Sequence, residues 1–321
     1  MSGDGTRKVA KPTEADLELA RVVVAAHLRP TPVVELELPG RDGQVLAKLE
    51  CMQPTGSFKV RGALAALAGA EPGARVVTAS AGNHALGVVF ASARLGVPAT
   101  VVVPRTASPA KLAALRRLGA RVLEHGDSYE EAERHALSLA VDGAVYVSAY
   151  NDPQVIAGQA TCGWELGEQV PGEVTVVVPV GGGGLLAGTA LWAAGREGAS
   201  VVGVEASASR ALSAAVRAGR IVQVPVAATL ADGLAGNLEP GSVTPGLAAG
   251  WVRAFAAVSE AEIEAAIRLL AVDCGLVVEG AGAVGVAALL AGRVPVAGRV
   301  VVVLTGRNIA ATALARILGT S

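Results

Sequence analysis

The sequence predicts an α/β fold of two subdomains, each a mainly parallel twisted sheet flanked by helices. Short runs of β-branched residues alternate with Ala- and Leu-rich helical patterns along nearly the whole chain, as is typical of parallel sheets wrapped by helices. Continuous valine runs, such as VTVVVPV at 174–180, suit strands buried on both faces. The 321 residues suffice for a large core and two subdomains.

The expected strands follow one another at fairly even spacing, with helical patterns between them. We expect strands at residues 44–49, 75–79, 99–103, 121–123, 144–147, 174–178, 201–204 and 299–304. Helical patterns include residues 84–95, 109–118, 129–140, 156–168 and 260–273. We expect residues 1–16 to be frayed.

Composition excludes several classes of function. With a formal net charge of −1 and 3% aromatic residues, the chain has no basic, aromatic-rich patch, so we expect no nucleic-acid partner. Its mean hydropathy is high at +0.49, but the longest apolar stretch, near residues 281–291, is shorter than the ~20 residues of a membrane span. No secretory leader is visible. We therefore expect a cytoplasmic protein without a membrane partner.

Cysteine and histidine usage gives no sign of a metal centre. The three cysteines form no CxxC pair, and the four histidines include no HExxH motif. We interpret the cysteines as small buried apolar residues and predict no metal site.

Ligands of parallel sheets bind beyond the carboxyl ends of the strands, and four polar or Gly-rich clusters follow predicted strands. The first contains Lys59, in PTGSFKVRGA. Only five of the 27 basic residues are lysines, which indicates that arginine is used at positions where only a positive charge is needed. A desolvated lysine can form an imine and arginine cannot. Taken alone, Lys59 could equally be a surface lysine at a helix start.

The second cluster is VGGGGLLAG at residues 180–188. Its glycines leave backbone N–H groups open to an anion, and the following helix adds its positive end, which predicts a phosphate site. There is no GK[ST] of a nucleoside-triphosphate loop. Glu205, about 20 residues further on, keeps a nicotinamide-dinucleotide interpretation open.

The remaining clusters offer polar contacts. SAGNHALG, from Ser80, can present several N–H groups to a carboxylate and adds the amide of Asn83. We assign His84 no acid–base role. Thr305, in TGRNI, offers a hydroxyl that could bond a heteroaromatic nitrogen. Each cluster alone is also explained by a helix cap. Together they provide the groups that a pyridoxal-phosphate enzyme needs.

The order of these motifs resembles the fold-type II pyridoxal-phosphate enzymes, which have a tryptophan-synthase-β-like architecture. Within them, the chain resembles the threonine/serine dehydratase and serine racemase branch. The resemblance rests on the motifs PTGSFKVRGA, SAGNHALG, VIAGQAT, GGGGLLAG, ADGLA, EGAGA and TGRN. It implies a large domain of residues 1–74 and 151–321, a small inserted domain of residues 75–150, and a homodimer.

The resemblance also implies residue roles. Lys59 would hold pyridoxal phosphate as an imine and later move the Cα proton. The other implied cofactor contacts are Phe58 beside the ring, Asn83 at its phenolic oxygen, Gly181, Gly182, Gly183, Gly184 and Leu185 at the phosphate, and Thr305 at the pyridine nitrogen. The implied contacts to the substrate carboxylate are Ser80, Ala81, Gly82 and His84, largely through backbone N–H groups. Glu279, in VVEGAGA, would lie behind the site as a hydrogen-bonded carboxylate.

The expected reaction is dehydration and deamination of a hydroxy amino acid, such as L-threonine or L-serine, to a 2-keto acid and ammonia. Alternatives of the same fold are an amino-acid racemase, a β-replacement synthase, or a dehydratase of the hydroxyectoine-pathway or hydroxyaspartate type. Serine racemases carry a serine where this chain has Ala81, which favours the dehydratase. The acidic partner that would accompany Glu205 at a racemase metal site is replaced by Ala211. From other classes, an oxidoreductase or a non-catalytic binding protein would leave Lys59 unexplained.

Overall fold

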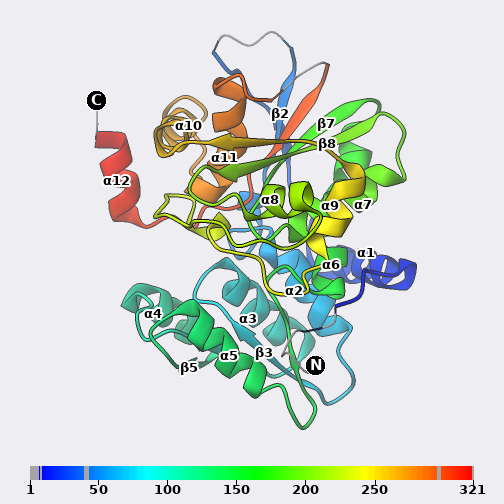
Figure 1. The fold of residues 1–321 in the computed structure, drawn as a ribbon, viewed down its shortest axis with the longest axis vertical. Helices are drawn as coiled ribbons and strands as arrows, with labels where there is room; N and C mark the ends of the chain where they lie inside the picture. The colour runs from blue at the N-terminus through cyan, green and yellow to red at the C-terminus, as the bar shows by residue number, and fades with distance from the viewer. Residues whose placement is uncertain (1–6, 8, 40–42, 295–297, 320–321) are drawn as a thin grey trace.

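Two sheets form the framework of the computed structural model, which describes residues 7, 9–39, 43–294 and 298–319 (Figure 1). The larger sheet has the strand order β1-β2-β10-β7-β8-β9. All of its neighbouring strands are parallel except β1, which pairs antiparallel with β2. Its strands are β1 (Val33–Glu35), β2 (Val45–Lys48), β7 (Val174–Pro179), β8 (Ala199–Ala206), β9 (Val252–Val258) and β10 (Val300–Val303).

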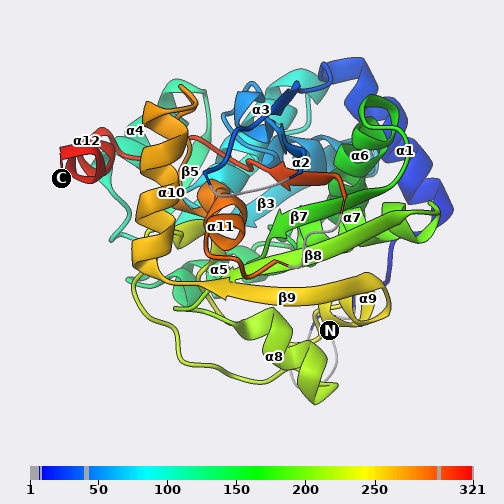
Figure 2. The same ribbon diagram turned by 90° about the horizontal axis from the view of Figure 1, so that it is seen from above.

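Helices cover both faces of this larger sheet (Figure 2). Because side chains alternate along a strand, Val177 and Val302 pack on one face with helices α10 (Glu260–Val272) and α11 (Gly280–Leu290). Val176 and Val301 pack on the other face with α6 (Pro153–Gln169) and α7 (Gly184–Ala194). The valine runs are therefore strands buried on both sides, as predicted.

The smaller sheet is wholly parallel, with the order β5-β4-β3-β6. Its strands are β3 (Arg75–Ala79), β4 (Ala99–Val103), β5 (Arg121–Glu124) and β6 (Ala144–Tyr146). Val102 packs toward α5 (Tyr129–Ser138). Val101 and Val103 face α3 (Asn83–Leu95) and α4 (Pro109–Arg117).

The remaining helices lie around these two sheets. They are α1 (Glu14–His27), η1 (Glu50–Met52), α2 (Lys59–Ala68), α8 (Ala211–Ala218), η2 (Asp232–Leu234), α9 (Thr244–Trp251) and α12 (Ala311–Gly319). No helix within the described ranges has the length and apolar content that crossing a bilayer requires.

A buried ionic network fixes α2, the helix that begins at Lys59. The Arg61 guanidinium lies 2.7 Å from carboxylate oxygens of both Glu50 and Glu165, and Lys48 Nζ lies 2.7 Å from Glu165. Burial alone would raise the pKa of Glu50, but the adjacent Arg61 lowers it to about 2. A buried charge is tolerated only when it is paired, so these contacts lock the first turn of α2 against η1 and α6.

The predicted fold class is confirmed, because the structure is an α/β arrangement of two mainly parallel sheets flanked by helices. All eight expected strands are present. The prediction missed β1, which has only three residues, and β9, whose side chains are mostly half-buried. We expected residues 1–16 to be frayed, and this was wrong for residues 13–16. A capping box at Thr13 starts helix α1 at Glu14. The domain boundaries remain a prediction.

Candidate active site

The candidate site lies where the carboxyl ends of strands from both sheets meet. Lys59 begins α2, and the backbone just before it is tied to the segment after β10 by the hydrogen bond from Phe58 N to Thr305 O, 3.0 Å. Lys59 Nζ donates to the carbonyl oxygen of Ala149, after β6, at 2.7 Å. Burial lowers the pKa of Lys59 to about 8, although the carboxylate of Glu279 acts in the opposite direction. This lysine is therefore a far better nucleophile and base near neutral pH than a surface lysine.

The glycine loop at residues 181–184 joins β7 to α7. Gly183 has φ +88°, a left-handed conformation that favours glycine, and α7 begins at Gly184. The hydroxyl of Thr244 donates to the carbonyl oxygen of Gly182 at 2.7 Å and so anchors the loop. The first-turn amides of α7, including that of the buried Leu185, have no partner within the helix. The loop is thus suited to an anionic group.

The ring of Tyr150 covers this loop closely. A Cβ atom placed on Gly182 would lie 2.3 Å from Cγ of Tyr150, and one on Gly181 would lie 2.9 Å from Cα of Leu234. Only glycine fits at these positions without moving its neighbours. In the sequence, these glycines were interpreted as leaving backbone N–H groups accessible to a ligand. The structure gives a second reason for glycine, because a larger residue would collide with Tyr150 or Leu234.

The segment Ser80–His84 follows β3, but its N–H groups are not all available. Ser80 N donates to Val102 O at 3.1 Å, and Gly82 N donates to Ser80 Oγ at 3.1 Å. Asn83 and His84 lie in the first turn of α3, where amides have no partner within the helix. The expected carboxylate contacts through the N–H groups of Ser80 and Gly82 are therefore not supported by this geometry, and the amides of Ala81, Asn83 and His84 remain.

His84 is buried, and its Nε2 lies 3.3 Å from the carbonyl oxygen of Val147. Burial, and then the nearby charge of Lys59, lower the pKa of His84 to about 3. The imidazole is therefore neutral at physiological pH, with its proton on Nε2. This agrees with the absence of an acid–base role in the sequence interpretation.

Asn83 is held from both ends of its amide. Its Nδ2 donates to Glu279 Oε1 at 2.7 Å, and its Oδ1 accepts from Asn308 Nδ2 at 2.6 Å. One Nδ2 hydrogen remains for a ligand. Burial, and then the charge of Asp232, raise the pKa of Glu279 to about 7. Contact between this glutamate and Gly306 is so close that a Cβ on Gly306 would lie 2.1 Å from Oε1.

Thr305 and Phe58 lie beside the lysine. Thr305 is 3% exposed and lies two residues after the end of β10. The Phe58 ring is half-buried, and its centroid is 5.2 Å from Lys59 Nζ. The structure thus places Lys59, Asn83, Glu279, Thr305 and the glycine loop around strand ends of the two sheets.

Glu205 has a structural explanation. It is 1% exposed, and its Oε1 accepts hydrogen bonds from the backbone N–H groups of Leu212 and Ser213, each 3.1 Å, at the start of α8. The carboxylate therefore caps a helix, where negative charge is favourable. Within the described residues, no group of three or more His, Cys, Asp or Glu side chains is placed to hold a metal ion.

Sequence reasoning missed several groups around the site. The Ser57 hydroxyl is buried beside Phe58 and has no hydrogen-bond partner among the residues that the structure describes. The Ala149 carbonyl and the carboxylate of Glu239 were also missed. A backbone carbonyl leaves no signature in a sequence, and Glu239 lies in an irregular loop without a motif.

The residues present fit a phosphate-bearing cofactor bound through an amine. A partly buried lysine with a lowered pKa, an orphaned buried hydroxyl at Ser57 and an open glycine loop at a helix N-terminus are complementary to an aldehyde and a phosphate. With this two-sheet architecture, they define a fold-type II pyridoxal-phosphate enzyme. The chain belongs to the family described as "Pyridoxal-phosphate dependent enzyme", which it matches over residues 24–306. The predictions of family and cofactor are confirmed.

Named relatives agree with this assignment. The chain is 43% identical over 312 residues to the L-threonine ammonia-lyase of Thermotoga maritima, a match that spans 95% of this chain and 76% of that protein. A solved threonine deaminase from T.th. is 35% identical, with a TM-score of 0.84 over 93% of this chain and 99% of that chain. Maize serine racemase is 28% identical, with a TM-score of 0.88 over 96% of this chain and 97% of that chain.

Proposed function

We propose that this protein dehydrates and deaminates a hydroxy amino acid, L-threonine or L-serine, to a 2-keto acid and ammonia. The observation that carries the proposal is the Lys59 amine, desolvated to a pKa of about 8, in a chain of this family. The names of its relatives, an L-threonine ammonia-lyase and a threonine deaminase, support the choice of reaction and substrate class.

Pyridoxal phosphate, when bound, supplies an electron sink next to the substrate Cα. Lys59 would hold it through its amine. The N–H groups of residues 181–185 at the start of α7 would receive the phosphate, because that helix end favours negative charge. Phe58 would pack beside the ring, and the free Nδ2 hydrogen of Asn83 would be the donor for its phenolic oxygen. The neutral hydroxyl of Thr305 would be the partner for its pyridine nitrogen.

Lys59 also moves the proton. As a neutral amine, its Nζ would take the proton from Cα of the substrate. The resulting ammonium would return a proton to the departing β-hydroxyl, so that the C–O bond breaks and water leaves. The released enamine is hydrolysed to the keto acid and ammonia. Because the pKa of Lys59 is about 8, the fraction of neutral amine rises as the pH increases through that value.

The substrate carboxylate binds at the start of α3. The amides of Ala81, Asn83 and His84 are the donors, while the side chain of Ser80 orients the turn through its bond to Gly82 N. Racemisation would need a proton donor on the opposite face of Cα. Ala81, at the position where racemases carry a hydroxyl, provides none, so racemisation is the less supported activity.

We propose the same domain division as the sequence predicts, with residues 75–150 as the small domain. The four strands of the smaller sheet all lie within that range, which supports it. The free cysteines support a cytoplasmic location, because disulfides are rare there. We propose a homodimer because of the family resemblance. We propose that the protein has no nucleic-acid partner because its formal net charge is −1.

The test is spectroscopic. Purified protein with pyridoxal phosphate should show the visible absorbance of a lysine-bound cofactor, and should release keto acid from L-threonine or L-serine. Lys59→Ala should lose both, whereas Lys11→Ala, at an exposed lysine, should keep both. Chiral analysis of the recovered amino acid distinguishes racemisation. A wild-type protein that stays colourless with pyridoxal phosphate would refute the proposal.

A further inference from the structure

The turn at residues 148–151 contacts the candidate site at two points. The carbonyl oxygen of Ala149 receives Lys59 Nζ at 2.7 Å. The ring of the next residue, Tyr150, covers Gly182 in the glycine loop. The conformation of this short turn therefore sets where the lysine amine and one wall of the loop lie.

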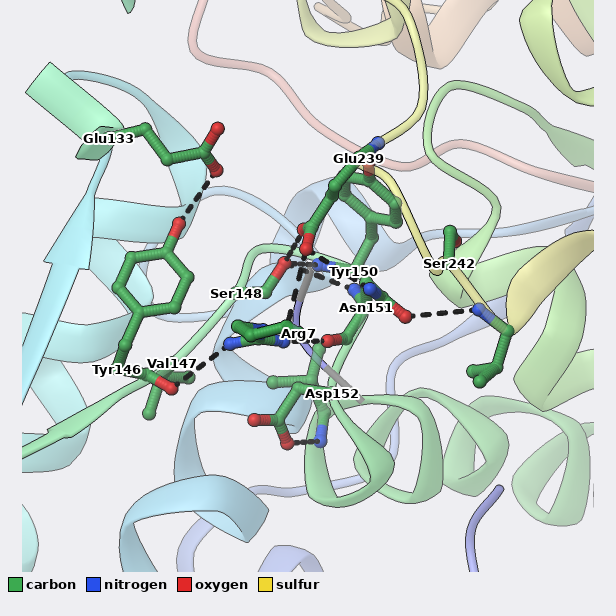
Figure 3. Close-up of polar contacts among 12 residues, drawn as sticks. Arg7, Glu133, Tyr146, Val147, Ser148, Tyr150, Asn151, Asp152, Glu239 and Ser242 are labelled. Atoms are coloured by element: carbon green, nitrogen blue, oxygen red, sulfur yellow. Dashed lines mark hydrogen bonds and ion pairs between the residues drawn. The ribbon is translucent and has the colours of Figure 1, made fainter. Parts of the chain in front are cut away.

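One carboxylate holds this turn on both sides of Ala149. Glu239, in the loop between η2 and α9, accepts hydrogen bonds from the hydroxyl of Ser148 and from Asn151 Nδ2, the latter at 3.0 Å. The backbone N–H of Glu239 donates to the Tyr150 hydroxyl at 2.6 Å. Figure 3 shows the Glu239 carboxylate directed toward Ser148 and Arg7.

The other polar groups of the turn are also hydrogen-bonded. Ser148 and Asn151 are 1% and 0% exposed. Asn151 N donates to Ser148 Oγ at 3.2 Å, and Asn151 Oδ1 accepts from Val243 N at 3.1 Å. Arg7 donates to the carbonyl oxygen of Asn151, and its guanidinium lies 3.9 Å from Glu239. The side chain of Glu239 is only 13% exposed, so these partners replace water around a buried charge.

We propose that Glu239 is a positioning residue for Lys59: through Ser148 and Asn151 it fixes the Ala149 carbonyl that orients the lysine amine. The inference rests on the proposed function. Glu239 touches neither the lysine nor the glycine loop with its side chain, so its effect passes through the turn. A carboxylate suits the role because both of its oxygens accept, from Ser148 on one side and Asn151 on the other.

Two variants distinguish the effect of the position of the Ala149 carbonyl on Lys59 from the effect of the Glu239 charge. Glu239→Gln keeps one acceptor oxygen, which can still receive Asn151 Nδ2, and turns the other into a donor. The bond to Ser148 would then have to reverse its direction, at an oxygen that already accepts from Asn151 N. Ser148→Ala breaks the same link without changing any charge. The matched control is Glu133→Gln, which removes a carboxylate bound to the hydroxyls of Tyr129 and Tyr146 but not to the turn.

The first measurement follows the visible absorbance of the lysine-bound cofactor when apo-protein is mixed with pyridoxal phosphate across a pH series. Lys59 Nζ donates to the Ala149 carbonyl, and removing an acceptor from a buried ammonium disfavours the charged form, so displacing this carbonyl should lower the pKa of the amine. We expect the pH midpoint of the reaction to fall below that of wild type in Glu239→Gln and in Ser148→Ala, and to stay unchanged in Glu133→Gln.

The second measurement is steady-state turnover of L-threonine by the reconstituted proteins. Misplacement of a proton-transferring group lowers kcat by about tenfold or more, while KM, set at the start of α3, changes by less than about threefold. The inference would be overturned if Glu239→Gln and Ser148→Ala both had the same pH midpoint and the same kcat as the wild type. A shift in Glu239→Gln alone would also overturn it, because that result is a charge effect.

The outcomes remain distinguishable from a failure of the proposed function. If wild type gives no lysine-bound absorbance, the proposed function fails and the role of Glu239 fails with it. If wild type gives the absorbance and turnover, the comparison of variants decides the positioning role alone. Should Glu239→Gln not fold, Ser148→Ala decides, because it leaves Glu239 paired with Asn151 and Arg7.

Discussion

Gly182→Ala is the sharpest perturbation of the phosphate site. The added methyl would lie 2.3 Å from Cγ of Tyr150 and within 2.5 Å of two further ring atoms. Ordinary carbon contacts begin near 3.4 Å, so methyl and ring must separate by about 1 Å. Tyr150 cannot easily move, because its hydroxyl is bonded to Glu239 N at 2.6 Å and its turn is held by Glu239. The glycine loop is therefore the part that yields.

The magnitude follows from this overpacking. Inserting a methyl group into a well-packed site costs about 1–3 kcal/mol. Since the displaced loop carries the proposed phosphate contacts, the cost falls on cofactor binding, and about 1.4 kcal/mol corresponds to a tenfold change in affinity. We expect the Kd for pyridoxal phosphate to rise by about 5- to 140-fold, with a smaller loss of apo-protein stability.

The assay is a titration of apo-protein with pyridoxal phosphate, followed by visible absorbance, together with thermal unfolding of each apo-protein. Gly246→Ala is the matched control, because a Cβ at Gly246, on an exposed turn of α9, meets no atom within 4 Å. That variant should bind the cofactor like wild type.

A double mutant isolates the clash. In a Tyr150→Ala background the methyl at residue 182 has room, so adding Gly182→Ala should change the Kd by less than about twofold. An affinity of the single variant Gly182→Ala within twofold of wild type would refute the reasoning. So would an undiminished loss in the Tyr150→Ala background, because the loss would then come from the loop itself.

Two further predictions concern buried charges. Glu50→Gln leaves Arg61 buried with only part of its charge neutralised, so the free energy of unfolding in urea should fall by about 3 kcal/mol. The contribution of Glu50 is complete above its ordinary pKa of 4.5 and is lost as the pH falls through about 2, so acid should narrow the difference between wild type and variant. Glu279→Gln keeps an acceptor for Asn83 but removes the charge that raises the pKa of Lys59, so the pH midpoint of lysine–cofactor bond formation should fall below about 8.

A control for the first of these variants comes from the same chain. Glu18→Gln removes a carboxylate whose side chain is 66% exposed and should leave unfolding in urea unchanged. A loss below about 1 kcal/mol for Glu50→Gln would contradict the account of the buried network. An unchanged or higher midpoint in Glu279→Gln would show that its charge does not act on Lys59.

The parts of the site that could be predicted are those formed by residues close together in the sequence. The glycine run at residues 181–184 sits between a strand and a helix, so its function follows from neighbours in sequence. Lys59 stood out because lysine is rare in this chain. Glu205 was ambiguous, because spacing alone cannot distinguish a ribose contact from a cap, and its bonds to Leu212 and Ser213 decide for the cap.

The parts that could not be predicted depend on contacts between distant segments. Glu239 reaches Ser148 across 91 residues, and Arg7 reaches Asn151 across 144. No local pattern records either contact. The amide of Ser80 is occupied for the same reason, because it pairs with Val102 of the neighbouring strand. The amide of Gly82 is different, because its partner, the hydroxyl of Ser80, lies only two residues away.

Two of the groups proposed to act on the cofactor, Asn83 and Lys59, are held by contacts between elements of the two sheets. Asn83 follows β3 of the smaller sheet, yet its amide is fixed at 2.7 Å by Glu279, which precedes α11 on the larger sheet. The Lys59 amine is met by Ala149, which follows β6 of the smaller sheet. A relative rotation of the sheets would therefore break both contacts at once. The hydrogen bonds that orient Asn83 and Lys59 therefore both depend on the two sheets keeping this placement.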